Sequence, residues 1–159
     1  MRALQLFWVY LLSGAVIAAP AANSDQQVQA LLTLKSPPPG VVFEIVASAN
    51  GLVWAIPKVR SYVTALRQKF PGIKLVVVSH GGEQFALQTK KSNIHKTIHA
   101  EVSRLVTIDG VKVQVCEAHA NRRGVVVKDF PDYVTVAAHG PQEIRNYLEF
   151  GYRHIKVSR

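Results

Sequence analysis

The sequence predicts an α/β fold: a single doubly wound, mostly parallel five-stranded sheet with helices on both of its faces. Two observations predict it. Short runs rich in valine and isoleucine recur along the chain, and segments with helical periodicity separate them. Strands that alternate with helices form parallel sheets, because each helix carries the chain back across a face of the sheet. The predicted strands are 41–48, 73–78, 111–115, 133–137 and 152–157.

The predicted helices are marked by their ends as well as by their apolar faces. Pro57 suits the first turn of the first helix, and Pro71-Gly72 ends it. Asn93 is predicted to cap the second long helix, a short helix is predicted over 83–91, and Gly140-Pro141 opens the last. The residues predicted to face inward are Val59, Val63, Leu66 and Phe70, then Ile94, Ile98, Val102 and Leu105, and finally Ile144, Tyr147 and Leu148.

The first residues are typical of an export signal. A positive start precedes a short apolar run and a small-residue cleavage motif, so residues 1–21 are predicted to be a signal peptide, with an uncleaved anchor as the alternative. The mature chain is expected in the periplasm or outside the cell, and no later stretch is long enough to cross a bilayer. Residues 22–40 are predicted to be a polar, proline-rich tether, with a short helix or edge strand over 28–32, before a domain over 41–159.

Charge and cysteine content narrow the choice of partners. The chain has 19 Lys and Arg against 10 Asp and Glu, a net charge of +9, which favours anionic partners such as an acidic protein, a small anion or a bilayer surface. Nucleic acid is not expected as the partner of an exported protein. The basic residues are scattered, so ordinary solvation also explains most of them. One cysteine excludes an internal disulfide framework.

That cysteine, Cys116, lies where a predicted strand runs into a short helix over 117–123, which Gly124 can end. Catalytic groups gather at the carboxyl ends of parallel strands. A thiol that faces a helix N-terminus there favours its thiolate form. His119, three residues later, would share a helix face with Cys116. The alternative is a buried cysteine with no chemistry.

Two further predicted strands end in candidate site residues. Ser79-His80-Gly81-Gly82 follows the second strand, where glycines allow a ligand to approach the backbone, and His139 follows the fourth. A solvated loop histidine is the alternative reading of His80. His95 and His99 have metal-ligand spacing but lack a third ligand, so no metal site and no cofactor are predicted.

With these elements in place, the domain resembles the DsrE/DsrF-like family of sulfur-relay proteins over about Val41 to Val157. The residues that carry the resemblance are His80-Gly81 at the end of the second strand, Val111-Lys112-Val113-Gln114-Val115 leading to Cys116, and Gly140-Pro141-Gln142-Glu143-Ile144 leading to Leu148-Glu149-Phe150-Gly151-Tyr152. The resemblance implies a compact α/β fold, homo-oligomers, a persulfide on Cys116, and His80 in the same cleft. The basic residues after Cys116 and the polar loop over 83–92 depart from the family pattern.

Two functional hypotheses follow. In the first, an exported protein accepts sulfane sulfur on Cys116 and passes it to an acceptor protein. The residues given catalytic roles are Cys116, His119 and His80, and those given substrate-binding roles are Gly81, Arg122, Arg123 and His139. In the second, the strand-end pocket and an oligomer interface form a non-catalytic module that binds a small anion or a partner. A Cys-His hydrolase ranks last, because no third group is found to orient the base.

Overall fold

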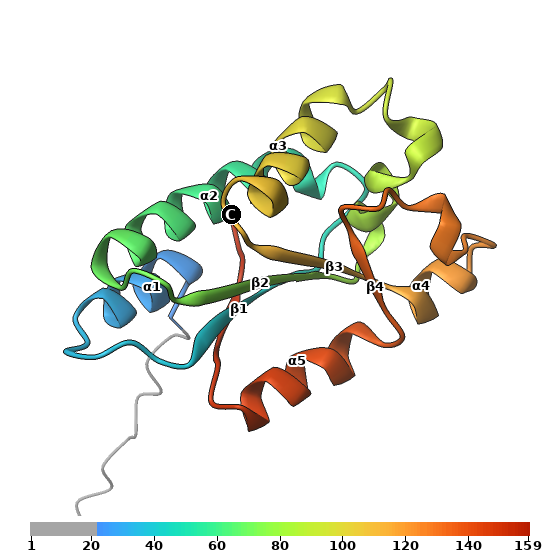
Figure 1. Ribbon diagram of the computed structural model, residues 1–159. Helices are drawn as coiled ribbons and strands as arrows, with labels where there is room; N and C mark the ends of the chain where they lie inside the picture. Colours follow the sequence, from blue (N-terminus) through green and yellow to red (C-terminus); the bar gives the residue numbers. More distant parts are fainter. Residues whose placement is uncertain (1–21) are drawn as a thin grey trace, which may run out of the picture.

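The computed structural model describes residues 22–159, and its centre is a five-stranded sheet in which every neighbouring pair is parallel. The strand order is β4-β3-β2-β1-β5 (Figure 1). The predicted α/β class is therefore confirmed, and the sheet is parallel throughout. The strands are β1 (Gly40–Ile45), β2 (Lys74–Ser79), β3 (Lys112–Cys116), β4 (Thr135–Ala137) and β5 (Arg153–Lys156).

Helices cover both faces of this sheet, as Figure 1 shows. The larger core forms where α1, α2 and α3 pack on one face, and α5 covers the other face through Ile144, which joins Val42, Val76 and Val78. The helices are α1 (Ser24–Leu32), α2 (Gly51–Lys69), α3 (Lys96–Thr107), α4 (Glu117–Asn121) and α5 (Gly140–Glu149), with 3-10 helices η1 (Gly82–Leu87), η2 (Thr89–Lys91) and η3 (Val127–Asp129).

Helix α2 begins earlier than the position of Pro57 in the sequence indicates. Pro57 was expected in the first turn, but α2 starts at Gly51 and the proline lies inside the helix. An interior proline costs about 3 kcal/mol, because its ring removes a backbone hydrogen bond. Leu52 and Ile56, which precede it, are buried in the larger core. Their burial outweighs that cost and extends the helix toward its N-terminus.

Three other sequence-based details are also wrong. Asn93 does not cap α3, which begins at Lys96, so Ile94 precedes the helix and is 77% exposed instead of buried. The segment 83–91 forms the two 3-10 helices η1 and η2 instead of an α-helix. On α5, Leu148 faces solvent, 42% exposed, because this helix buries a narrower stripe around Ile144.

The N-terminal segment belongs to the domain instead of tethering it. Its apolar patch forms helix α1, the helical one of the two predicted alternatives, and Val28 and Leu31 enter the larger core. Polar contacts fix the same helix, since the Tyr62 hydroxyl donates to Ser24 Oγ at 3.0 Å, and Ser158 N donates to that oxygen at 3.3 Å. The predicted signal peptide, residues 1–21, lies outside the described residues.

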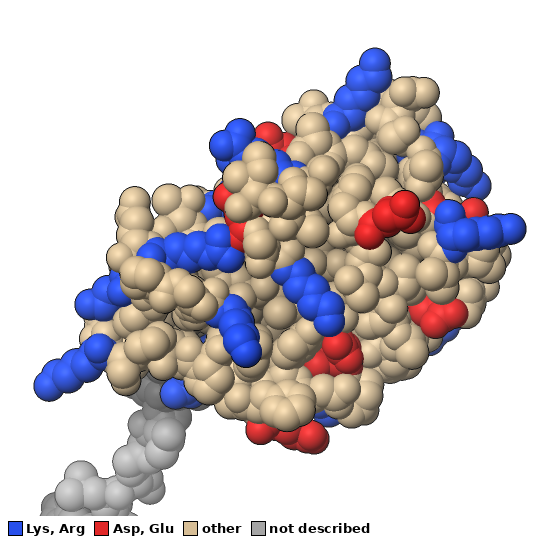
Figure 2. All heavy atoms as spheres, viewed as in Figure 1, with Lys and Arg blue, Asp and Glu red and all other residues tan. Residues whose placement is uncertain are grey.

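Two surface properties bear on the partners. Among residues 22–159, the structure has no helix that is both long and apolar enough to cross a bilayer. Figure 2 shows lysines and arginines scattered over the viewed face, with acidic side chains between them. On this face, no single-sign charge patch is seen, so a preference for an anion there would come from a local arrangement of groups.

The packing of α1 predicts the effect of one substitution on stability. Leu31→Ala is expected to lower the free energy of unfolding by about 2–3 kcal/mol, because it removes buried methyl groups and leaves a cavity at the contact with α2. Gln29→Ala, on the exposed side of the same helix, is expected to change it by less than about 0.5 kcal/mol. Urea denaturation followed by circular dichroism measures both, and equal, negligible effects would return this segment to the role of a tether.

Candidate functional site

A small pocket opens at the carboxyl end of the sheet, where β2, β3 and β4 finish. Its volume is about 170 Å³. We call it the strand-end pocket; it is lined by His80, Cys116, Ala118, His119, Arg122, His139 and Pro141. The structure thus brings together five of the seven predicted site residues, which come from three separate strand ends. The remaining two, Gly81 and Arg123, are not among the residues that line it.

Cys116 ends β3 and lies in the wall of the strand-end pocket, with only 3% of its surface exposed. Its sulfur lies 3.3 Å from the backbone nitrogen of Gly140, whose N–H donates to it. Gly140 is the first residue of α5, so the sulfur receives a hydrogen bond from a helix N-terminus, where the helix dipole favours negative charge. The stabilising amide belongs to α5, whereas the sequence predicted the short helix that follows Cys116.

A glycine makes this close approach of α5 possible. A Cβ atom placed on Gly140 would lie 2.8 Å from Cβ of His80 and 3.3 Å from Cβ of Cys116. Real side chains do not tolerate the first of these distances, so only glycine fits between the ends of β2 and β3. The same contact shows that His80 and Cys116 flank one point of the α5 backbone, as neighbours across the pocket.

The Glu44 carboxylate on β1 holds His80, which follows the neighbouring strand β2, in position. Glu44 Oε1 lies 2.8 Å from His80 Nε2, and its Oε2 lies 2.9 Å from Nε2 of His154 on β5. The Glu44 side chain is 14% exposed. Hydrogen bonds from His154 and then His80 hold the pKa of Glu44 well below its usual range, so the group is ionised at neutral pH. His80 therefore has one nitrogen committed to Glu44 and a fixed ring orientation.

The basic residues after Cys116 divide between two positions. Arg122 and the ring of His119 line the strand-end pocket. Arg123 instead lies over the ring of Phe85, with its guanidinium carbon 5.0 Å from the ring centre, and the His119 ring packs on the same phenylalanine at 5.3 Å. The structure therefore gives Arg122 a place beside the pocket, whereas Arg123 takes part in a cation-π contact.

Gly81 lies outside the strand-end pocket and packs against the loop that follows β1. Its N–H donates to Glu83 Oε1 at 2.9 Å, and an added Cβ would meet the backbone of Ala47 at 2.7 Å. Glu83 is fully buried and also accepts hydrogen bonds from Ser79 Oγ and from the Ala47 amide, both at 2.7 Å. This carboxylate thus joins the loops that follow β1 and β2, so the glycine serves close packing of those loops.

Gln84 fixes the backbone of the cysteine itself. Its Oε1 accepts the Cys116 N–H at 2.8 Å, and its Nε2 donates to the Cys116 carbonyl at 3.4 Å. Sequence reasoning missed Glu44, Glu83 and Gln84 as site residues. A signal existed only for Glu44, the single charged residue inside an apolar strand. Gln84 lies in η1, within the polar stretch 83–92, and nothing in the local sequence pattern marks it as buried.

The two histidines with metal-ligand spacing have other roles. His95 is the N-cap residue of α3. His99 bridges two loops, with Nε2 3.1 Å from the Ala86 carbonyl oxygen and Nδ1 2.7 Å from the Tyr133 hydroxyl. Burial raises the pKa of Tyr133 to about 12, so the hydroxyl keeps its proton at neutral pH. Across the described range, no group of three or more His, Cys, Asp or Glu residues is placed to bind a metal ion.

The tight fit at Gly140 predicts that Gly140→Ala is damaging. The added methyl group is expected to push α5 away from His80, lower the free energy of unfolding by about 1–3 kcal/mol and slow the alkylation of Cys116 near neutral pH. Gly82→Ala is the matched control, because its nearest neighbour would lie at 3.4 Å, an ordinary contact. Urea denaturation and intact mass measure the two effects, and identical behaviour of both variants would contradict the fit described here.

The lowered pKa of Glu44 predicts a specific acid sensitivity. The stabilisation from this group is fully present above its ordinary pKa of 4.5 and is lost as the pH falls toward the lower value of the folded protein. Between pH 5.5 and pH 3, the free energy of unfolding of the wild type should therefore fall more steeply than that of Glu44→Gln, by on the order of 1 kcal/mol. Glu149→Gln, on an exposed residue of α5, should follow the wild type; parallel curves for all three proteins would refute the assignment.

Comparisons with known proteins add evidence on the fold. No family model matches the sequence, and no curated protein matches it. Among solved structures, the chain is similar to MTH1491, a protein of unknown function from Methanobacterium thermoautotrophicum, with 20% sequence identity and a TM-score of 0.57. The match covers 73% of this chain and 96% of that one. A likeness at this identity shows a shared α/β fold.

Proposed function

We propose that this chain is a DsrE/DsrF-like thiol protein that accepts sulfane sulfur as a persulfide on Cys116. The observation that carries the proposal is the hydrogen bond from Gly140 N–H to the Cys116 sulfur at 3.3 Å, inside a pocket lined by three histidines and an arginine. A helix N-terminus and the positive charge of Arg122 both attract negative charge, such as that of the sulfur in its nucleophilic form. The same groups attract an anionic donor.

The chemistry is a single displacement at sulfur. The Cys116 thiolate attacks the sulfane sulfur of the donor, a new S–S bond forms, and the donor's own bond to that sulfur breaks. With thiosulfate as the donor, sulfite leaves with the bonding electron pair, so charge and electrons balance without an outside oxidant. His119, which lines the same pocket, is assigned the thiol proton, and Arg122 is assigned to the anionic group of the donor.

The size of the pocket favours a small donor. A volume of about 170 Å³ is well below the roughly 300 Å³ at which pockets for drug-sized ligands begin. Cys116 is also 3% exposed, so a loop from another protein does not reach its sulfur in this conformation. The proposal therefore gives the first step to a small sulfur-containing anion and requires the pocket to open when the sulfur passes to an acceptor protein. Export and homo-oligomerisation remain part of the proposal, from the N-terminal sequence and the resemblance.

The test measures the reactivity of Cys116 by intact mass. The folded wild type should be alkylated by iodoacetamide well below the free-thiol pKa of about 8.5, and incubation with thiosulfate should add about 32 Da, the mass of one sulfur atom. Cys116→Ser should show neither change. Arg122→Ala should lose more of its rate with anionic iodoacetate than with neutral iodoacetamide, whereas Arg145→Ala, an exposed residue of α5, should leave the ratio of the two rates unchanged.

The second candidate function is binding of a small anion without a covalent step. The low exposure of Cys116 is the observation that favours it, because a buried sulfur can serve packing alone. In that case Cys116→Ser would keep full affinity for sulfate or phosphate in calorimetry. The thiol would then resist alkylation until the protein unfolds, and no 32 Da adduct would form. This combination of results rejects sulfur transfer while leaving the anion site intact.

A further inference from the structure

Strand β5 forms an edge of the sheet whose outer side is open. It pairs with β1 through Val41↔Arg153 to Glu44↔Lys156, and no other segment among residues 22–159 pairs with it. An open edge offers unpaired N–H and C=O groups to another chain. Three features of this edge bear on its partner: the orientation of its backbone, the neighbouring groove and its charge.

The backbone orientation identifies the free groups. The N–H of Val157 donates to the Glu44 carbonyl at 2.9 Å, so the peptide groups of residue 157 face β1. Successive residues of a strand point their N–H and C=O groups to opposite sides. The peptide groups of His154 and Lys156 therefore face away from β1, toward the open edge. An added strand would pair with these two residues.

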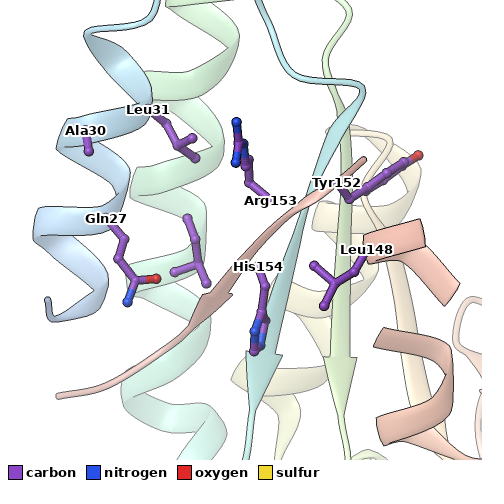
Figure 3. A pocket seen from close by; sticks show the side chains of 8 residues that line it. Gln27, Ala30, Leu31, Leu148, Tyr152, Arg153 and His154 are labelled. Carbon is purple, nitrogen blue, oxygen red and sulfur yellow. The ribbon is translucent and has the colours of Figure 1, made fainter. Parts of the chain in front are cut away.

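A groove runs along this edge, with a volume of about 460 Å³ (Figure 3). Gln27 and Leu31 of α1 form one side, and Leu148 of α5 with Tyr152, the residue before β5, forms the other. Leu148 is one of the large apolar side chains that this protein exposes. The groove thus combines an open strand edge with apolar side chains on both sides, which is how domains that bind extended peptides give affinity and specificity.

The charge of the edge selects the partner. Arg153, His154 and Lys156 are exposed, and the described residues that line the groove include no Asp or Glu. A second copy of the chain, paired antiparallel through β5, would bring the positive charges of Arg153 and Lys156 in the two copies together, which destabilises a strand pair. An acidic strand would instead place carboxylates opposite them. We propose that the β5 edge groove binds an extended acidic segment of another protein as an added strand.

The proposal is independent of sulfur transfer, and the probe is a labelled eight-residue peptide that alternates glutamate with valine. It should bind the full chain in fluorescence anisotropy and slow the hydrogen exchange of the His154 and Lys156 amides. The same peptide with lysine for glutamate, or with a central proline, should bind much more weakly. Lys156→Glu should weaken binding by about tenfold or more, because it places like charges together. Lys90→Glu, the same charge change at a distant exposed site, should have little effect.

Two substitutions at one position separate backbone pairing from charge. Lys156→Gln removes the charge but keeps the outward N–H, whereas Lys156→Pro removes both and leaves the pairing with β1 in place. Strand addition requires the proline variant to bind more weakly than the glutamine variant, with circular dichroism confirming that both are folded.

Several outcomes would overturn the proposal. Equal loss in Lys156→Glu and Lys90→Glu would show general charge attraction. An edge already protected from exchange without peptide, or sedimentation that depends on concentration and on Lys156, would show that the chain itself or a second copy covers the strand. Failure of the acidic peptide to bind at millimolar concentration would show that the charges only protect the edge from aggregation.

Discussion

The candidate site depends on the contact between Gly140 and the ends of β2 and β3. Because this residue has no side chain, α5 starts close enough to the sheet for its first N–H to reach Cys116 Sγ and for its backbone to separate His80 from the cysteine. The same approach places His139 at the pocket, as the N-cap residue of α5. A larger residue here would widen the pocket and remove the hydrogen bond from the Gly140 N–H to the Cys116 sulfur.

Hydrogen bonds of buried polar side chains also fix the strand ends and the loops around Cys116. Glu83 joins the loops after β1 and β2, and Gln84 accepts from and donates to the backbone of Cys116. Gln114, buried on β3, donates to Glu143 at 3.0 Å and accepts from Tyr147 at 2.9 Å, which fixes α5 against the sheet. Buried groups that are fully hydrogen-bonded specify one arrangement, whereas an unpaired one would destabilise the fold. The position of the thiol is therefore set by polar contacts as well as by apolar packing.

The sequence was sufficient to predict a five-stranded, mostly parallel α/β sheet and the grouping of His80, Cys116 and His139, because parallel strands bring their carboxyl ends to one edge. The sequence was insufficient where a contact between residues far apart in the chain sets the position of a group. The amide that reaches Cys116 comes from a residue 24 positions later, and Arg123 is drawn from the pocket by Phe85. The predicted start of α2 was wrong for the same reason, because burial of Leu52 and Ile56 against the core begins the helix before Pro57.

One carboxylate connects the two surfaces that carry the functional proposals. Glu44 accepts from His80, which lines the strand-end pocket, and from His154, which lines the groove at β5. Each of its oxygens is committed to a different histidine, so a movement of either ring changes the environment of the other. A strand added at the β5 edge would lie beside His154, which shares the Glu44 carboxylate with His80. The fold thus places the groove at β5 and the strand-end pocket at different positions on the sheet, with Glu44 hydrogen-bonded to a histidine of each.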